Sequence, residues 1–263
     1  MDKKTADKSK FLKLDKYVIL LLFLIIFDLE LFGIFGEIVP FRDYVNVFEG
    51  GYRILSGQVQ YLDFYFPTGP MVFLIQAFFQ FIIGSNLFAM AAQSFVLAIV
   101  LCTLFYYLIR KEFSLILSFI FALFFYLSFN GLTFQPWYDH LAYFFFFLNI
   151  FLLLKYYKQI SLPKSVYILS AILATLSFYS KQDVGLLQVF FVLIFFIFNY
   201  SKELKSTFKY YLFPLVLMVG GIFFIFSLFT DITYWFNLGQ YPHSSRFSHI
   251  FITIKSFNII TSL

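Results

Sequence analysis

The chain has 263 residues, of which 61% are hydrophobic and 25% aromatic, whereas only 13% are charged. This composition leaves too few polar side chains to cover a soluble globule, so the sequence predicts an integral membrane protein. The single cysteine, Cys102, excludes a disulfide framework and Cys-rich zinc or iron–sulfur sites, because these need at least two thiols. We expect no nucleic-acid partner from the net charge of +5, since excess Lys and Arg in a membrane protein mark its cytoplasmic side.

Apolar runs along the chain define the predicted helices. A spanning helix needs about 20 mostly apolar residues, and the candidate segments are 17–36, 87–109, 113–129, 139–157, 165–180, 184–200 and 208–229. Segment 71–83 would extend only about 20 Å as a helix, short of the roughly 30 Å hydrocarbon core, and is predicted to be interfacial or re-entrant. The expected fold is an all-α, polytopic transmembrane bundle with about seven spans and a helical first outer loop.

Basic residues orient this bundle. With a cytoplasmic N-terminus and a non-crossing segment 71–83, 14 of the 19 Lys and Arg residues fall on the inner side, as the positive-inside rule favours. We therefore expect a multi-pass protein of the cell membrane with its active site on the outer face. The predicted organisation is a basic cytoplasmic N-terminus (1–16), a transmembrane catalytic-type module (17–230) that includes the outer loop 37–70, and a C-terminal segment (231–263) for which truncation is one alternative.

The same topology places half of the 14 carboxylates at the outer face. They are Glu37, Asp43, Glu49, Asp63, Asp139, Asp183 and Asp231. Such a cluster with few basic neighbours suggests a site. The alternative is that the positive-inside rule depletes Lys and Arg outside, so that acids look concentrated without a function.

The first outer loop carries an amphipathic pattern. Residues 43–56 have apolar side chains at spacings of three and four, which predicts a helix lying on the membrane surface. Asp43, Asn46 and Glu49 share its polar face, and Arg53 flanks them. The alternative is an ordinary solvated face of an interfacial helix.

This loop resembles the first outer loop of the polyprenyl-phosphate-sugar-dependent membrane glycosyltransferases, a family that includes protein O-mannosyltransferases and lipid A aminoarabinose transferases. The resemblance rests on an aspartate, a helix ending in Ser-Gly, a Tyr-x-Asp-Phe step and a Gly-Pro that opens the next apolar segment. The matching residues are Asp43, Ser56, Gly57, Tyr61, Asp63, Phe64, Gly69 and Pro70. The later stretch FYSKQDVGL, which holds Lys181 and Asp183, is similar to one in many relatives, and the similarity covers residues 15–200.

The resemblance implies a GT-C fold and places Asp43 in the catalytic centre. In many relatives a glutamate follows this aspartate directly, whereas Tyr44 follows it here. Glu49 or Asp63 is therefore a candidate for the second carboxylate. Family members are typically longer, so this chain is expected to be a fragment or an N-terminal half.

The chemistry also fits the residues directly. Inverting transfer of a sugar from a lipid phosphate to a hydroxyl needs a base, for which Asp43 is the candidate. The phosphate leaving group needs cations or a metal, for which Lys181 is the first candidate, because an unpaired charge between two apolar helices is costly. Lys181 could instead pair with Asp183 or extend to the surface. Arg53 is a second choice for phosphate contact, although it could serve only the surface. Tyr61 also belongs to the predicted substrate-binding set.

The turn FNGLTFQPWYDH adds Asp139 and His140 to the predicted substrate-binding set. A polar group beside an aromatic would suit a sugar, whereas a tryptophan here also reads as an interfacial belt residue. Adjacent ligands without a third partner give only a weak metal signal. No cofactor is certain from the sequence, and a divalent cation, Mg or Mn, is a possible one.

The predicted function is a membrane glycosyltransferase whose partners are the lipid bilayer, a polyprenyl-phosphate sugar donor and a glycan, lipid or protein acceptor. Two alternatives remain: a carrier or flippase for lipid-linked glycans, and a non-catalytic membrane scaffold. A transporter is expected to have polar groups near mid-membrane and repeated halves, and the sequence shows no such repeat.

Overall fold

The computed structural model describes residues 3–35, 42–66, 68–130, 138–232 and 234–235, and it describes the side chains of these ranges except for 3–13, 34–35, 42–44 and 130. The described chain is helical, with one isolated β-bridge, Gln60 to Phe64, and no strand. The helices, in chain order, are α1 (Lys3–Phe35), α2 (Arg42–Leu55), α3 (Pro70–Ile83), α4 (Leu87–Ile109), α5 (Leu115–Asn130), α6 (Tyr138–Tyr156), α7 (Lys164–Ser180), α8 (Gln182–Asn199), the 3₁₀ turn η1 (Ser201–Glu203), α9 (Leu204–Thr207), the π-helical turn η2 (Phe208–Leu212) and α10 (Phe213–Phe229).

Local sequence signals set several helix ends. Pro70 stands in the first turn of α3, where its missing N–H is not needed. The side chain of Asn86 caps α4 by accepting a hydrogen bond from the N–H of Ala89. After α2, Gly57 adopts a φ of +83°, a left-handed conformation that glycine takes without strain, and the chain turns there as predicted.

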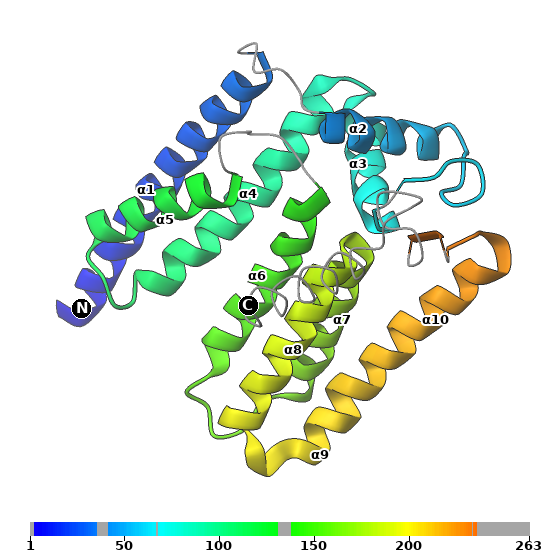
Figure 1. Cartoon of the computed structure of the whole chain (residues 1–263). Coiled ribbons are helices and arrows are strands. Elements are labelled where there is room, and N and C mark those ends of the chain that lie inside the picture. Colours follow the sequence, from blue (N-terminus) through cyan, green and yellow to red (C-terminus); the bar gives the residue numbers. More distant parts are fainter. Residues whose placement is uncertain (1–2, 36–41, 67, 131–137, 233, 236–263) are drawn as a thin grey trace, which may run out of the picture.

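The helices form two groups that α2 and α3 join at one end of the molecule (Figure 1). In the first group, α4 packs against α1 and α5. In the second group, α7 packs against α6, α8 and α10, and the two groups meet where α4 contacts α6. The largest buried cluster lies in the second group and includes Tyr167, Phe196 and Tyr211.

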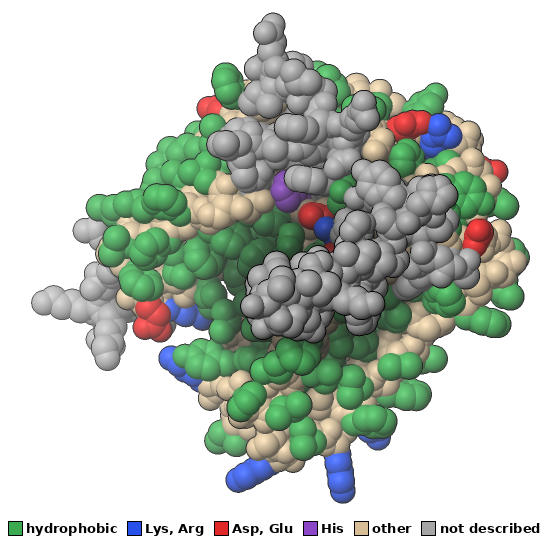
Figure 2. Space-filling model, in the orientation of Figure 1, with side chains coloured by type: hydrophobic (Ala, Val, Ile, Leu, Met, Phe, Trp, Pro, Cys, Tyr) green, Lys and Arg blue, Asp and Glu red, His purple; other side chains and the backbone are tan. Residues whose placement is uncertain are grey.

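The structure confirms an all-α membrane bundle. Helices occur at each predicted span, and four are long and apolar enough to cross a membrane: α4, α6, α8 and the continuous run Ser201–Phe229. Helices α3, α5 and α7 are apolar but shorter, and α1, whose apolar stretch holds Asp28 and Glu30, is not among the four. Figure 2 shows many hydrophobic side chains on the surface of the described residues, as expected for helices that face lipid. The count of about seven spans stays a prediction.

The domain boundaries also stay predictions. Helix α1 continues through residue 16 without interruption, and most of the segment 231–263 lies outside the described residues.

Polar contacts tie neighbouring helices together inside the apolar bundle. The amide of Asn149 on α6 donates to the carbonyl of Ser170 on α7 at 3.1 Å, and the hydroxyl of Ser177 on α7 donates to the carbonyl of Ala142 on α6 at 3.0 Å. Such hydrogen bonds typically join helices in membrane proteins. They fix α7 against α6, and therefore fix the end of α7 where the predicted phosphate-binding lysine lies.

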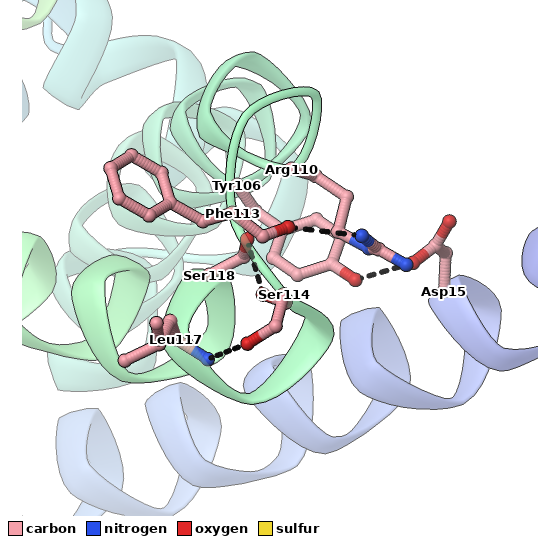
Figure 3. Close-up of polar contacts among 7 residues, drawn as sticks. All are labelled: Asp15, Tyr106, Arg110, Phe113, Ser114, Leu117 and Ser118. Atoms are coloured by element: carbon pink, nitrogen blue, oxygen red, sulfur yellow. Dashed lines mark hydrogen bonds and ion pairs between the residues drawn. The ribbon is translucent and has the colours of Figure 1, made fainter.

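A charged contact joins α1 to α4 at the other end of the bundle (Figure 3). The carboxylate of Asp15 accepts hydrogen bonds from Arg110 Nε at 3.0 Å and from the Tyr106 hydroxyl at 2.6 Å. The Asp15 and Arg110 side chains are only 12% and 17% exposed. This contact anchors α1 to α4, and a second polar contact joins α1 to α5, where the hydroxyl of Tyr126 donates to the carboxylate of Glu30 at 3.0 Å.

Candidate functional site

The break between α7 and α8 positions Lys181. Helix α7 ends at Ser180 and α8 begins at Gln182, while Lys181 between them has extended backbone angles of −152° and 117°. Gly185 allows α8 to start close against the end of α7, because a Cβ there would lie 2.2 Å from the Cα of Phe178. Lys181 therefore lies at the tip of a helical hairpin.

Lys181 lies between two carboxylates from different helices. Its Nζ is 2.6 Å from Oδ1 of Asp139, in the first turn of α6, and 3.9 Å from Oδ2 of Asp183, in the first turn of α8. The ammonium also lies 5.5 Å from the centre of the Tyr138 ring. Side-chain exposures of 19% for Lys181, 25% for Asp139 and 56% for Asp183 show that the cluster is held in place yet reachable from outside.

His140 follows Asp139 in the first turn of α6. Its ring lies 5.4 Å from the ring of Phe129, near the end of α5, in a tilted arrangement. The histidine is partly exposed. His140 therefore follows Asp139 directly in the chain, and its ring lies beside Phe129 of α5.

The end of the loop between α2 and α3 is fastened to this same helix break. The N–H of Gly69 and the hydroxyl of Thr68 both donate to the carbonyl of Ser180, at 3.2 and 3.3 Å. A Cβ on residue 69 would lie 1.9 Å from the carbonyl oxygen of Tyr179, so only glycine fits this approach. The residue that precedes Lys181 is thus bound directly to the loop.

Tyr61 holds the loop in its shape from inside. Its side chain is fully buried, and its hydroxyl donates to the carbonyl of Thr68 at 2.5 Å, beside the amide of Gln60, which donates to the same oxygen at 2.8 Å. Burial raises the pKa of the Tyr61 hydroxyl well above its usual value, with the neighbouring Tyr234 adding to the shift, so the hydroxyl stays a donor. Tyr61 also has a φ of +63°, an uncommon conformation for a non-glycine residue.

The chain after α10 returns to the loop. The N–H of Asp231 donates to the carbonyl of Tyr61 at 2.8 Å, and the amide of Gln182 donates to the carbonyl of Trp235 at 3.4 Å. The Trp235 ring packs 5.7 Å from the ring of Phe178 and 5.7 Å from that of Tyr179. Three distant parts of the sequence therefore meet at the α7–α8 break.

The polar face of α2 carries a second charged pair. Arg53 donates to the Glu49 carboxylate through Nε at 2.8 Å and forms an ion pair with it through Nη2. The guanidinium also donates to Gln58 at 3.2 Å and lies 5.7 Å from the centre of the Phe64 ring. Glu49 and Arg53 therefore satisfy each other, one helical turn apart.

Helix α2 lies close against α3 because two consecutive glycines face that helix. A Cβ on Gly50 would lie 2.2 Å from the Phe73 ring, and one on Gly51 would lie 2.7 Å from the Gln76 side chain. The amide of Gln80 donates to the carbonyl of Phe48 at 3.0 Å across the same contact. This packing fixes α2, whose first turn contains Asp43, although the Asp43 side chain lies outside the described residues.

Asp63 has a local role in the described loop. Its exposed carboxylate accepts a hydrogen bond from the N–H of Val59 at 2.7 Å and closes the turn between them. Among the described residues, no three His, Cys, Asp or Glu side chains are grouped as metal ligands. The divalent cation stays a prediction.

The structure thus brings together Lys181, Asp139 and Asp183 from the predicted set, with His140 next in sequence. Among the described residues, no hydrogen bond or ion pair connects this cluster to the Glu49–Arg53 pair. Tyr61 is buried inside the loop, where its hydroxyl binds the carbonyl of Thr68. Sequence reasoning missed Thr68, Gly69 and Ser180 as the residues that join the loop to the helix break. The Gly-Pro step at Gly69 was the available signal, because a glycine before a helix-starting proline can mark a close backbone approach.

A sequence model of the family described as dolichyl-phosphate-mannose-protein mannosyltransferase matches residues 67–226. The matched range begins at the loop end that binds Ser180 and includes the Lys181 cluster. No curated protein and no solved structure matches the chain.

Proposed function

Because this chain belongs to the dolichyl-phosphate-mannose-protein mannosyltransferase family, we propose that it transfers a sugar from a polyprenyl-phosphate donor to an acceptor hydroxyl at the outer face of the cell membrane. The family implies a membrane mannosyltransferase-like glycosyltransferase with a lipid-linked donor. The observation that carries the proposal for this chain is the Lys181–Asp139–Asp183 cluster, held at a helix end by the first outer loop.

Lys181 is proposed to bind the phosphate of the donor. Its side chain is 19% exposed at the tip of the α7–α8 hairpin, and its ammonium lies 5.5 Å from the centre of the Tyr138 ring. A donor phosphate arriving there would replace or join Asp139 as the partner of the cation. The same cation would then stabilise the charge that develops as the sugar–phosphate bond breaks.

Asp43 is proposed to be the general base. In an inverting transfer the base takes the proton of the acceptor hydroxyl, the acceptor oxygen forms a bond to the anomeric carbon, and the bond from that carbon to the phosphate oxygen breaks on the opposite side. The polyprenyl phosphate leaves as an anion. The position of Asp43 in the first turn of α2, where backbone N–H groups favour negative charge, suits a carboxylate that is ionised when the acceptor arrives.

The proposed orientation puts the Lys181 end of α7 outside and the Lys164 end inside. It rests on the 14 basic residues that this orientation assigns to the inner side. A cysteine introduced at the exposed position Gln58 should react with a membrane-impermeant thiol reagent added to intact cells, whereas one at the exposed position Gln159 should not.

The activity test compares four purified proteins in liposomes: wild type, Asp43→Asn, Lys181→Gln and Glu112→Gln. Glu112 is an exposed carboxylate after α4 and serves as the matched control. Release of polyprenyl phosphate from a panel of lipid-linked sugars is the measurement. We expect Asp43→Asn and Lys181→Gln to lose about 100-fold or more in turnover, while Glu112→Gln retains it.

Equal turnover of Asp43→Asn and wild type would remove this aspartate from the mechanism. Binding of the lipid by all four proteins without turnover would favour the carrier alternative. Loss of activity in Glu112→Gln as well would point to a folding effect, which circular dichroism and size-exclusion chromatography of each variant would reveal.

A further inference from the structure

A second positively charged site lies at the end of α7 opposite Lys181. Lys164 is the first residue of α7, and Lys209 lies in the π-helical turn η2. Their ammonium groups lie 5.2 and 5.4 Å from the centre of one ring, that of Tyr210. Two cations from separate helices therefore converge on a single aromatic side chain.

The backbone explains why this ring lies between the two lysines. In η2 the N–H of Phe213 donates to the carbonyl of Phe208, five residues earlier, rather than four. Pro214 follows directly, and it has no N–H that could donate to the carbonyl of Tyr210. In a regular α-helix the proline ring would also clash with that carbonyl. The wide turn accommodates the proline, and wide turns of this kind occur frequently at functional sites.

The positive charge at this site has no paired carboxylate among the residues that the structure describes. Within the part of the chain that the structure describes, neither Lys164 nor Lys209 forms an ion pair. The nearest carboxylate along the chain from Lys209, Glu203, accepts a hydrogen bond from the Tyr167 hydroxyl at 2.8 Å. Both lysines are exposed, and Figure 2 shows Lys and Arg side chains projecting from the end of the molecule where α9 lies.

We propose that Lys164, Lys209 and Tyr210 bind the phosphate of an anionic phospholipid in the leaflet opposite the Lys181 site. A phosphate between two ammonium groups accepts charge-assisted hydrogen bonds from both. The phenol hydroxyl of Tyr210 can donate a further one.

The surroundings favour a lipid over a free phosphate ion. The site stands at the start of α10, where Phe213, Val216 and Leu217 are exposed, so acyl chains attached to the phosphate would lie along an apolar helix face. Basic pockets between membrane helices on one side of the bilayer are known to hold anionic headgroups. This inference is independent of the proposed transfer reaction, because it concerns the other end of α7.

Native mass spectrometry of the purified full chain tests the proposal, with short-chain phosphatidylglycerol and phosphatidylcholine as the two probes. The variant Lys164→Gln/Lys209→Gln is compared with Lys202→Gln/Lys205→Gln, which removes the same charge from two exposed lysines at the same end of the molecule. We expect the first variant to lose about tenfold or more in phosphatidylglycerol affinity, because it removes both ammonium groups that contact the phosphate, and one lysine contributes about fivefold to binding an anionic headgroup. The second should lose less than about threefold, and Lys164→Arg/Lys209→Arg should retain wild-type binding.

Equal losses in the two glutamine double variants would overturn the site in favour of diffuse surface charge. Equal affinity of the wild type for both lipids would overturn the requirement for an anionic lipid. Displacement of phosphatidylglycerol by inorganic phosphate at the same concentration would show that a free ion is the ligand. If the double variant does not fold, Lys209→Gln alone gives the same comparison, with an expected loss of about fivefold.

Discussion

Lys181 lies closer to Asp139, on a different helix, than to Asp183, two residues away along the chain: the N–O distances are 2.6 and 3.9 Å. The reason is that Lys181 turns between α7 and α8 while Asp139 opens α6, which packs along α7. The lysine therefore connects three helices at one end of the bundle.

Removing the Asp139 carboxylate should lower the stability more than removing the Asp183 carboxylate. Asp139→Asn is expected to lower the free energy of unfolding by about 1–2 kcal/mol, less than for a fully buried pair because both side chains are partly exposed. Asp183→Asn should cost under about 0.5 kcal/mol, since its carboxylate is farther away and more exposed. Denaturant unfolding in detergent, followed by circular dichroism, measures both, and equal effects would contradict the assignment of Asp139 as the main partner.

Gly69→Ala should separate the loop between α2 and α3 from the α7–α8 break. A Cβ 1.9 Å from the Tyr179 carbonyl cannot be accommodated without moving the backbone, so we expect a loss of about 2 kcal/mol or more in stability. Gly220→Ala on α10 is the matched control, because a Cβ there meets nothing within 4 Å and alanine favours a helix. Thermal unfolding of the two variants is the measurement, and the prediction fails if they unfold alike.

Tyr61→Phe should weaken the loop without removing its core packing. The change deletes the hydrogen bond from the hydroxyl to the Thr68 carbonyl and leaves the buried ring in place, so the expected cost is about 1 kcal/mol. Tyr52→Phe on α2, where the side chain is exposed, should have no measurable effect. Hydrogen exchange at the N–H of Gly69 measures how stably the loop is bound to Ser180. Unchanged protection there would show that the Tyr61 hydroxyl does not stabilise the loop.

Asp15→Asn should loosen α1 from α4. The carboxylate accepts from both Arg110 and Tyr106 in a largely buried contact (Figure 3), so losing its charge should cost about 1–2 kcal/mol. Lys16→Gln, at the adjacent exposed position, is the control. Limited proteolysis of α1 in detergent compares the two, and equal cleavage rates would count against the anchor.

Much of the fold follows from the sequence because helix formation in a membrane depends on local composition. Runs of apolar residues bounded by charge, Pro or Gly predicted several helix ends within a few residues; one example is the predicted 87–109 against α4, Leu87–Ile109. The amphipathic loop helix was similarly close, since period and a following Ser-Gly are local signals. The start of the first span was wrong as a helix boundary, because α1 begins at Lys3 rather than near residue 17. The π-turn before Pro214 was missed inside a segment predicted as one regular span.

The sequence by itself determined that the protein is a helical membrane protein, that Lys181 stands between two helices, and that the segment before the Gly-Pro step carries a helix with Asp43 near its start. Only the tertiary structure decided that Asp139 rather than Asp183 is the close partner of Lys181, that Tyr61 is buried, and that Gly69 lies against Tyr179. Hydropathy and spacing act within a segment, whereas these relationships arise from backbones that pack together after being separated along the chain.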